Sequence, residues 1–343
     1  MDNDRYRGCL LGGAIGDALG AGVEFLSLAE IERRHGPAGV TGYVPAYGRL
    51  GAITDDTQMT LFTAEGLLRD RRLPPAGRDA TAAIWRAYRR WLSTQEDGPS
   101  PARQSCGWLI SQEFLHAERA PGNTCLSALW AGQPGTPLQR VNDSKGCGGV
   151  MRVAPIGLAG DDPFALGGQA AALTHGHPSG YYSAGALAVI INEAVRGADL
   201  PAAVSAALDA LRRVAWPSEA AEVTASLEQA VVLAQLGPAR PATIAALGAG
   251  WVGEEALAIA VHCALTAADF RSGVLAAVNH GGDSDSTGAI CGSLLGASLG
   301  AGAIDSDLLA GLEGRDVITQ VADDLYAVFA CGLAPDAVRY PPG

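Results

Sequence analysis

Glycine recurs at every fourth position in two segments near opposite ends of this 343-residue chain. A helix has 3.6 residues per turn, so each set would line one helix face. Glycine inside a helix costs roughly 1 kcal/mol relative to alanine, and close backbone packing can recover that cost. We therefore predict that two helices touch along these faces. The positions are Gly8, Gly12, Gly16 and Gly20 in the first segment, and Gly288, Gly292, Gly296 and Gly300 in the second.

This contact would bring acidic residues from both ends of the chain together. Asp17 and Glu24 belong to the first glycine segment and its exit, whereas Asp283 and Asp285 directly precede the second. More than 250 residues separate the two pairs in sequence. A helix contact is therefore a physical means of building one acidic site from both ends.

The segment Gly281–Thr287, Gly-Gly-Asp-Ser-Asp-Ser-Thr, places two carboxylates beside three hydroxyls. Such an all-oxygen set suits a hard cation such as Mg²⁺ or Mn²⁺. The alternative is a simple helix N-cap, because Ser and Asp are favoured there. A second cluster, Thr54-Asp55-Asp56-Thr57, opens another apolar-striped helix. One capping residue would suffice there, and adjacent carboxylates repel each other unless a cation offsets them.

Composition limits the partners of the chain. Its formal charge is -12 without a Lys or Arg cluster, so stable binding to nucleic acid or an anionic membrane is not expected. Its seven cysteines are scattered singly, which is typical of a reduced cytoplasmic protein, and the acidic N-terminus does not resemble an export signal. The uncharged stretch 287–304 is long enough to span a membrane, but its glycine spacing favours a packed protein core.

Apolar residues keep helical period over most of the chain, and strand-type alternation is almost absent. We expect an all-α fold with one core, because the chemical clusters near both ends must converge. Residues 26–53 are predicted to be mainly loop, with a strand-like piece at Val40–Val44. Residues 93–105 are predicted to form a long irregular loop, in which Asp97 is interpreted as a solvated side chain.

Two further segments could contact a ligand. In 144–152, three glycines could present backbone N–H groups to a phosphate or ribose, with Lys145 and Arg152 adding positive charge; the alternative is a tight turn. In 174–178, His175 and His177 lack a nearby third imidazole or thiolate, which makes a zinc site improbable. A histidine hydrogen-bonded to a ligand or to the backbone is the favoured interpretation.

Five motifs together resemble the ADP-ribosylglycohydrolase family, in family order from about residue 5 to 330. They are Gly16-Asp-Ala-Leu-Gly with Glu24-Phe25, Thr54-Asp-Asp-Thr, Gly146-Cys-Gly-Gly-Val-Met-Arg, Thr174-His-Gly-His-Pro and Gly281-Gly-Asp-Ser-Asp-Ser-Thr. The resemblance implies a compact orthogonal helical bundle, a single domain over 1–343, and a centre of two divalent cations, Mg²⁺ or Mn²⁺.

The resemblance also implies site residues. Glu24, Asp55 and Asp285 are the expected catalytic residues, and Glu24 is our candidate for proton transfer. Cys147 departs from the pattern, since some members carry Asn there. The expected metal ligands are Thr54, Asp55, Asp56, Asp283, Asp285 and Ser286. The expected ADP-ribose-binding residues are Lys145, Gly146, Cys147, Gly148, Gly149, Met151, Arg152 and His175.

The implied activity is hydrolysis of the glycosidic bond between ADP-ribose and a protein side chain, releasing ADP-ribose. The Glu24-Phe25 and Asp-Ser-Asp-Ser-Thr forms favour an arginine linkage, while serine-linked, O-acetyl and nucleobase-linked ADP-ribose stay open. An inactive ADP-ribose-binding module also stays open, as does a phosphatase, because 283–287 fits Asp-x-Asp-x-Thr. The phosphatase ranks lower, since its nucleophile requires the end of a parallel strand. We expect a cytoplasmic monomer.

Overall fold

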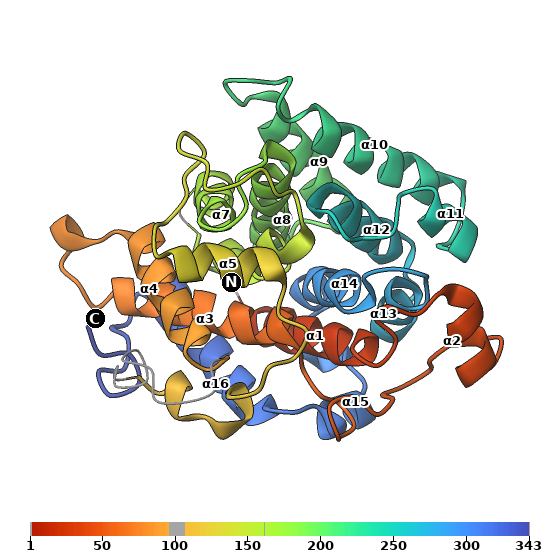
Figure 1. Cartoon of the computed structure of the whole chain (residues 1–343), viewed down its shortest axis with the longest axis horizontal. Helices are drawn as coiled ribbons and strands as arrows, with labels where there is room; N and C mark the ends of the chain where they lie inside the picture. The colour runs from red at the N-terminus through yellow and green to blue at the C-terminus, as the bar shows by residue number, and fades with distance from the viewer. Residues whose placement is uncertain (1, 96–106, 161, 343) are drawn as a thin grey trace.

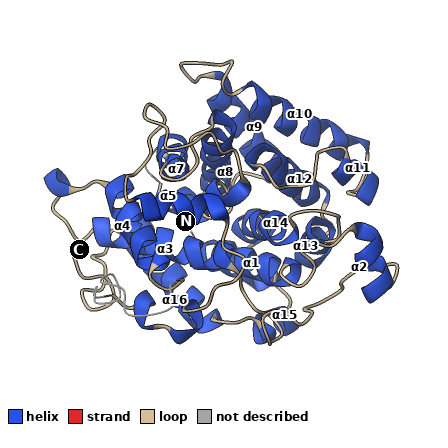
Figure 2. Cartoon of the chain, viewed as in Figure 1, coloured by secondary structure: helices blue, strands red, loops and turns tan. Residues whose placement is uncertain are grey.

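The computed structural model describes residues 2–95, 107–160 and 162–342 (Figure 1). Its regular structure is helical, and the described residues contain no β-strand, only isolated bridges at Ala46–Arg49 and Gly146–Val252 (Figure 2). The all-α prediction is confirmed. Asp97 and most of its predicted loop lie outside the described residues.

The α-helices are joined by connections of very different lengths. They are α1 (Asn3–Gly20), α2 (Leu28–His35), α3 (Asp55–Asp70), α4 (Ala80–Leu92), α5 (Asn123–Ala131), α6 (Ala154–Ala159), α7 (Pro163–Ala172), α8 (Pro178–Val195), α9 (Leu200–Arg212), α10 (Ala221–Leu236), α11 (Pro241–Ala245), α12 (Gly253–Thr266), α13 (Phe270–Val278), α14 (Ser284–Leu299), α15 (Ser306–Gly311) and α16 (Arg315–Leu325). Shorter turns include η5 (Cys147–Gly149) and the π-helical η7 (Tyr326–Ala330).

Helices α1 and α14 pack against each other along their glycine faces, as predicted (Figure 1). A β-carbon added to Gly12 would lie 2.3 Å from the carbonyl oxygen of Gly292, and one added to Gly16 would lie 1.9 Å from that of Gly288. Only glycine permits this antiparallel approach. Asp17 and Glu24 are thereby fixed beside the N-terminus of α14.

The segment 26–53 is mainly irregular, but it contains helix α2, which was not predicted. Ser27 and Glu30 form a capping box: Glu30 N donates to Ser27 Oγ at 3.3 Å, and Ser27 N donates to Glu30 Oε2 at 3.0 Å. The strand prediction at Val40–Val44 was wrong. The Asn279 side chain pairs with both backbone groups of Val40, at 2.8 and 2.9 Å, where a neighbouring strand would otherwise bond.

The core surrounds α8, α12 and α14, whose residues are buried on nearly all sides. The part of the uncharged stretch that lies within α14, residues 287–297, is therefore covered by other helices. Among the described residues, no helix combines the length and apolar character needed to cross a bilayer. This packing places the N-termini of α3 and α14 and the exit of α1 around one cavity.

Candidate active site

The N-terminus of α14 contributes Asp283, Asp285 and Ser286. Asp283 is the N-cap, and the Ser286 backbone N–H lies 3.2 Å from Asp283 Oδ1 and 3.0 Å from Asp285 Oδ1. The second oxygen of Asp283, Oδ2, accepts from the Cys147 thiol at 2.7 Å. The cap interpretation and an acidic cluster therefore hold together. Thr287 points elsewhere: its hydroxyl donates to the backbone carbonyl of Asp283 at 2.7 Å. With Asp283 at a helix start and no strand in the described chain, the phosphatase alternative has no support.

The N-terminus of α3 contributes Asp55 and Asp56. Thr54 is the N-cap, and its Oγ1 accepts from Asp56 N at 3.2 Å. A second cap comes from α1: buried Asp17 accepts from Thr54 N at 3.0 Å and from Thr57 N at 3.2 Å, and it also accepts from the Thr57 hydroxyl. Asp17 therefore fixes the start of α3 against α1. Its position near the cluster was predicted, but its capping role was not.

Glu24 lies just beyond α1, and its backbone N–H donates to Gly20 O at 3.0 Å. Ligand oxygens of Glu24, Asp283 and Asp285 all lie within 4.8 Å of one another. Glu24 Oε2 and Asp56 Oδ2 are buried without a hydrogen-bond partner. Phe25, the next residue, has a positive φ of 65°, a strained conformation for an aromatic residue. The predicted meeting of acidic residues from both chain ends is confirmed.

Burial and mutual repulsion disfavour the ionised forms of these carboxylates. Burial, followed by the charge of Asp285, raises the pKa of Asp17 to about 7 and that of Glu24 to about 11. The same two causes raise the pKa of Asp55 and Asp56 well above the usual range, while the pKa of Asp285 is raised by burial and by Asp283. The cluster therefore requires either bound protons or a cation.

The carboxylates line a cavity of about 510 Å³. Eleven predicted site residues are on its wall: Glu24, Asp55, Asp56, Gly146, Cys147, Gly148, Met151, His175, Asp283, Asp285 and Ser286. Thr54, Lys145, Gly149 and Arg152 are not on this wall. The cavity thus brings together the acidic clusters, the glycine loop and the histidine that the sequence singled out.

The two expected positive charges are directed elsewhere. Lys145 Nζ lies 2.9 Å from Glu222 Oε2 and also pairs with Glu254. Arg152 is fully buried, with its guanidinium 4.3 Å from the centroid of the Tyr88 ring. The described cavity wall consequently contains no Lys or Arg. An anionic ligand in this acidic cavity would need neutral hydrogen-bond donors and bound cations.

Several wall residues were not predicted. Residues 120–125 come from the turn before α5 and from its first residues, and Trp251 comes from the glycine-rich segment before α12. The Trp251 ring stacks on that of Phe25 with centroids 5.4 Å apart and planes at 19°. No sequence signal placed the turn at 119–124 at the cavity.

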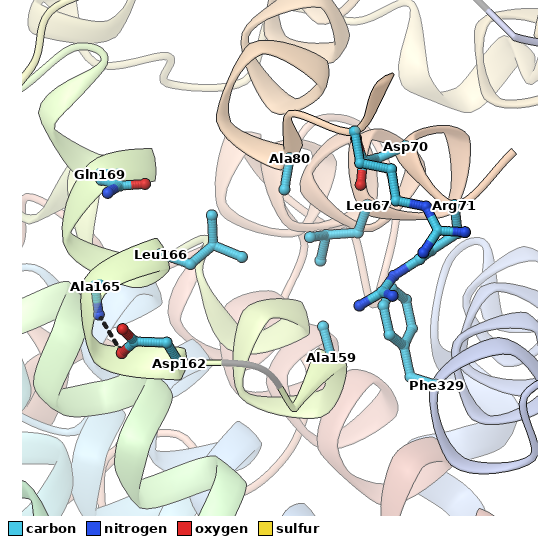
Figure 3. A pocket seen from close by; sticks show the side chains of 11 residues that line it. Leu67, Asp70, Arg71, Ala80, Ala159, Asp162, Ala165, Leu166, Gln169 and Phe329 are labelled. Atoms are coloured by element: carbon cyan, nitrogen blue, oxygen red, sulfur yellow. Dashed lines mark hydrogen bonds between the residues drawn. The ribbon is translucent and has the colours of Figure 1, made fainter. Parts of the chain in front are cut away.

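A second cavity, of about 400 Å³, lies between α3, α7 and η7 (Figure 3). The Arg71 guanidinium lies 4.8 Å from the centroid of the Phe329 ring, and the Asp162 carboxylate accepts from Ala165 N at 3.2 Å. None of the predicted site residues lines this cavity. The candidate active site is therefore the acidic cavity.

An all-α fold with this acidic cavity matches a known family. Residues 2–333 match the family described as ADP-ribosylglycohydrolase, and the chain belongs to that family. A solved structure of an ADP-ribosylglycohydrolase-related protein complex superposes with a TM-score of 0.67 at 28% identity, covering 94% of this chain and 97% of that one.

Named relatives span nearly the whole chain. The ADP-ribosyl-[dinitrogen reductase] glycohydrolase of Rhodospirillum rubrum is 27% identical, with 91% of each chain covered. ADP-ribosylhydrolase ARH3 of Mus musculus is 25% identical, with 95% of this chain and 92% of the relative covered. An uncharacterized protein of Archaeoglobus fulgidus is 29% identical, with 94% and 96% covered. Family membership supports hydrolysis of an ADP-ribose conjugate.

Proposed function

We propose that this protein is a divalent-cation-dependent hydrolase that removes ADP-ribose from arginine side chains of proteins. The observation that carries the proposal is the convergence of Glu24, the Asp55–Asp56 pair and the Asp283–Asp285 pair on one cavity. Family membership supplies the class of reaction. The arginine linkage and the number and identity of the cations are the finer parts of the proposal.

The donor set fits hard divalent cations. The aspartates supply oxygen ligands, and Asp56 Oδ2 is a buried atom without a protein partner. Thr54 and Ser286 hydroxyl oxygens would complete the coordination. Because the predicted donors are oxygens, Mg²⁺ or Mn²⁺ is favoured over Zn²⁺. When bound, two such cations would offset the carboxylate charge, act as Lewis acids and orient the ribose hydroxyls.

The side chains around the cavity would have different roles in the reaction. Cleavage at ribose C1 requires a proton for the departing guanidine and removal of a proton from the attacking water. Glu24 is suited to carry a proton between the water and the guanidine, because it lines the cavity and its buried Oε2 has no protein partner. Asp55 and Asp285 would bind the cations beside the bond that is cleaved. The 146–148 loop, Met151 and His175 form the part of the wall that would contact ADP-ribose.

An arginine linkage suits the acidic and aromatic residues of the cavity wall. The leaving guanidinium is a planar cation, and it would depart past Glu24 and past the stacked rings of Phe25 and Trp251. Carboxylates and aromatic faces both favour such a cation. We further propose that the chain acts as a single-domain monomer in the cytoplasm; its described cysteines are unpaired.

A substrate panel tests this proposal. The protein with Mg²⁺ or Mn²⁺ is incubated with arginine-linked, serine-linked, O-acetyl and nucleobase-linked ADP-ribose, and released ADP-ribose is quantified. We expect the fastest release from the arginine peptide and none after EDTA. Faster release from another conjugate would refute the arginine linkage. Stoichiometric binding without release would instead support a binding module.

A further inference from the structure

Arg152 is a buried cation whose described partners are all neutral. Its guanidinium donates to Thr174 Oγ1 at 2.7 Å and to Ala170 O at 3.3 Å, and it lies over the Tyr88 ring. No described carboxylate forms an ion pair with it. Burying a charge without an ionic partner costs free energy. We therefore ask whether the hydrogen bond from Arg152 to Thr174 has a functional role.

The bond from Arg152 restricts what the Thr174 hydroxyl can do. A hydroxyl has one proton to donate and two lone pairs that can accept. Two groups form hydrogen bonds with Oγ1: the Arg152 guanidinium at 2.7 Å, which can only donate, and His175 Nδ1 at 2.8 Å, which has a lone pair when it is unprotonated. Of these two groups only Nδ1 can receive the hydroxyl proton, and it then accepts. A neutral imidazole that accepts at Nδ1 carries its own proton on Nε2.

Nε2 lies beside the glycine loop of the cavity wall, 3.5 Å from the place of a β-carbon on Gly146. His175 lines the acidic cavity, and a β-carbon added to Gly148 would lie only 3.2 Å from Nε2. The glycine at 148 thus leaves room for the edge of the imidazole beside the loop. A proton on Nε2 is a hydrogen-bond donor in a cavity whose described wall contains no Lys or Arg.

We propose that Arg152 and Thr174 are positioning residues that hold His175 in the tautomer protonated on Nε2, so that the ring donates a hydrogen bond to substrate. The acceptor would be a phosphate or hydroxyl oxygen of ADP-ribose, and in this respect alone the inference rests on the proposed function. Arg152 would thus influence ligand binding through the hydrogen bonds from Arg152 to Thr174 and from Thr174 to His175, without lining the cavity itself.

The electrostatics of the site agree with a neutral ring. Burial, followed by the charge of Arg152, lowers the pKa of His175 to about 3. The imidazole therefore stays uncharged at neutral pH and donates from one nitrogen only. Which nitrogen donates is then decided by the hydrogen bond at the other one.

Nitrogen NMR of the ligand-free protein tests the tautomer without any substrate. Protonated and unprotonated ring nitrogens have distinct ¹⁵N shifts, and the His175 signals are assigned by their loss in His175→Gln. We expect protonated Nε2 and unprotonated, hydrogen-bonded Nδ1. In Thr174→Val the Nδ1 signal should move to the position of an acceptor without a donor, whereas Thr174→Ser should match the wild type. A protonated Nδ1 in the wild type would overturn the proposal.

Two variants extend the test to Arg152 and to binding. Arg152→Met removes the donor to Thr174 Oγ1, so that Nδ1–H can take its place as donor and the tautomer protonated on Nδ1 should appear; if this variant does not fold, Thr174→Val carries the test. Calorimetry should show ADP-ribose bound about ten-fold more weakly by Thr174→Val than by Thr174→Ser, as for loss of one oriented hydrogen bond. Equal affinities would overturn the positioning role. A wild type that does not bind ADP-ribose would refute the proposed function, and the ligand-free spectra would still decide the tautomer.

Discussion

At the scale of the residue, carboxylates that repel one another are held together by partners of different kinds. Asp283 and Asp285 share the backbone N–H of Ser286, and Asp17 is satisfied by donors at the start of α3. Glu24 Oε2 is left without a partner. The side chains therefore differ in function: Asp17 is structural, whereas Glu24 Oε2 and Asp56 Oδ2 have no protein partner and are available to a cation or a proton.

Asp283→Asn should abolish cation binding and activity while the fold is kept. Asparagine is as good an N-cap as aspartate, so α14 should still begin at residue 284. The variant lacks the ligand charge, and Mg²⁺ affinity measured by calorimetry should fall by at least about 100-fold, the upper end of the loss for supporting residues around a metal. Asp316→Asn is the matched control, since the Asp316 side chain is 89% exposed. Retained Mg²⁺ affinity in Asp283→Asn would remove this residue from the ligand set.

Glu24→Gln should separate proton transfer from cation binding. Glutamine has nearly the same shape but cannot transfer the proton, so turnover should fall by about 10² to 10⁴. Mg²⁺ affinity should stay close to that of the wild type if the aspartates hold the cations. Because Glu24 lies within 4.8 Å of Asp283 and Asp285 ligand atoms, a large loss of affinity would instead identify it as a ligand. Undiminished turnover would exclude it from the reaction.

At the scale of the element, the contact between α1 and α14 is what assembles the site. Their backbones approach so closely that the exit of α1 lies against the N-terminus of α14: a β-carbon on Gly20 would lie 2.4 Å from Asp285 N. Small changes of spacing along this contact would move Glu24 relative to Asp285. The glycines therefore have a functional consequence beyond packing.

Gly12→Ala should be strongly destabilising, and Gly13→Ala should not. The added methyl group at position 12 meets the backbone carbonyl of Gly292 at 2.3 Å, whereas at position 13 it meets the Ser293 hydroxyl at 2.4 Å, which a rotamer change can move. Overpacking of this kind costs roughly 3 kcal/mol, against a gain of about 1 kcal/mol in helix propensity. Urea denaturation should therefore show that Gly12→Ala alone loses about 2 kcal/mol or more of unfolding free energy. Equal losses in both variants would show that the close backbone contact is not what limits substitution.

The sequence predicted those elements whose cause is local or periodic. The glycine spacing predicted the α1–α14 contact, and the acidic motifs predicted most of the cavity wall. Side-chain directions were not predictable in this way. Lys145 is paired with residues 77 and 109 positions away, which no local pattern reveals. Helix α2 is a different case, because its Ser27–Glu30 capping box is a local signal from which the helix could have been predicted.

At the scale of the whole molecule, residues from both chain ends belong to the same packed core. The Tyr6 hydroxyl donates to Leu158 O at 2.8 Å, and Arg7 Nε lies 2.6 Å from Asp323 Oδ1. Part of the chain could therefore not unfold without disturbing the rest. If the chain is a single domain, as predicted, it should unfold in one cooperative step.

Calorimetric unfolding should show one transition, with equal calorimetric and van't Hoff enthalpies. Near-UV circular dichroism and cation release should follow the same curve, because the site is built from α1, α3 and α14 together. Two resolved transitions would contradict a single cooperative domain.

Mg²⁺ should raise the melting temperature more at pH 8 than at pH 5.5. In the cation-free protein the pKa of Asp17 is raised to about 7 from an ordinary 3.8, so its contribution to stability is complete below 3.8 and is lost as pH rises through 7. The pKa values of Asp55, Asp56 and Asp285 are shifted in the same direction. At pH 5.5 Mg²⁺ must displace protons from Asp55, Asp56 and Asp285, whereas at pH 8 it relieves the repulsion between their charges. Because ligand binding to the folded state raises stability, the melting temperature should rise more at pH 8.

The buried histidines do not disturb this comparison. Their lowered pKa values destabilise the protein in acid both with and without Mg²⁺, so their effect cancels in the difference between the two melting temperatures. NaCl at equal ionic strength is the control, and an equal Mg²⁺ shift at both pH values would show that the cation does not bind to these carboxylates.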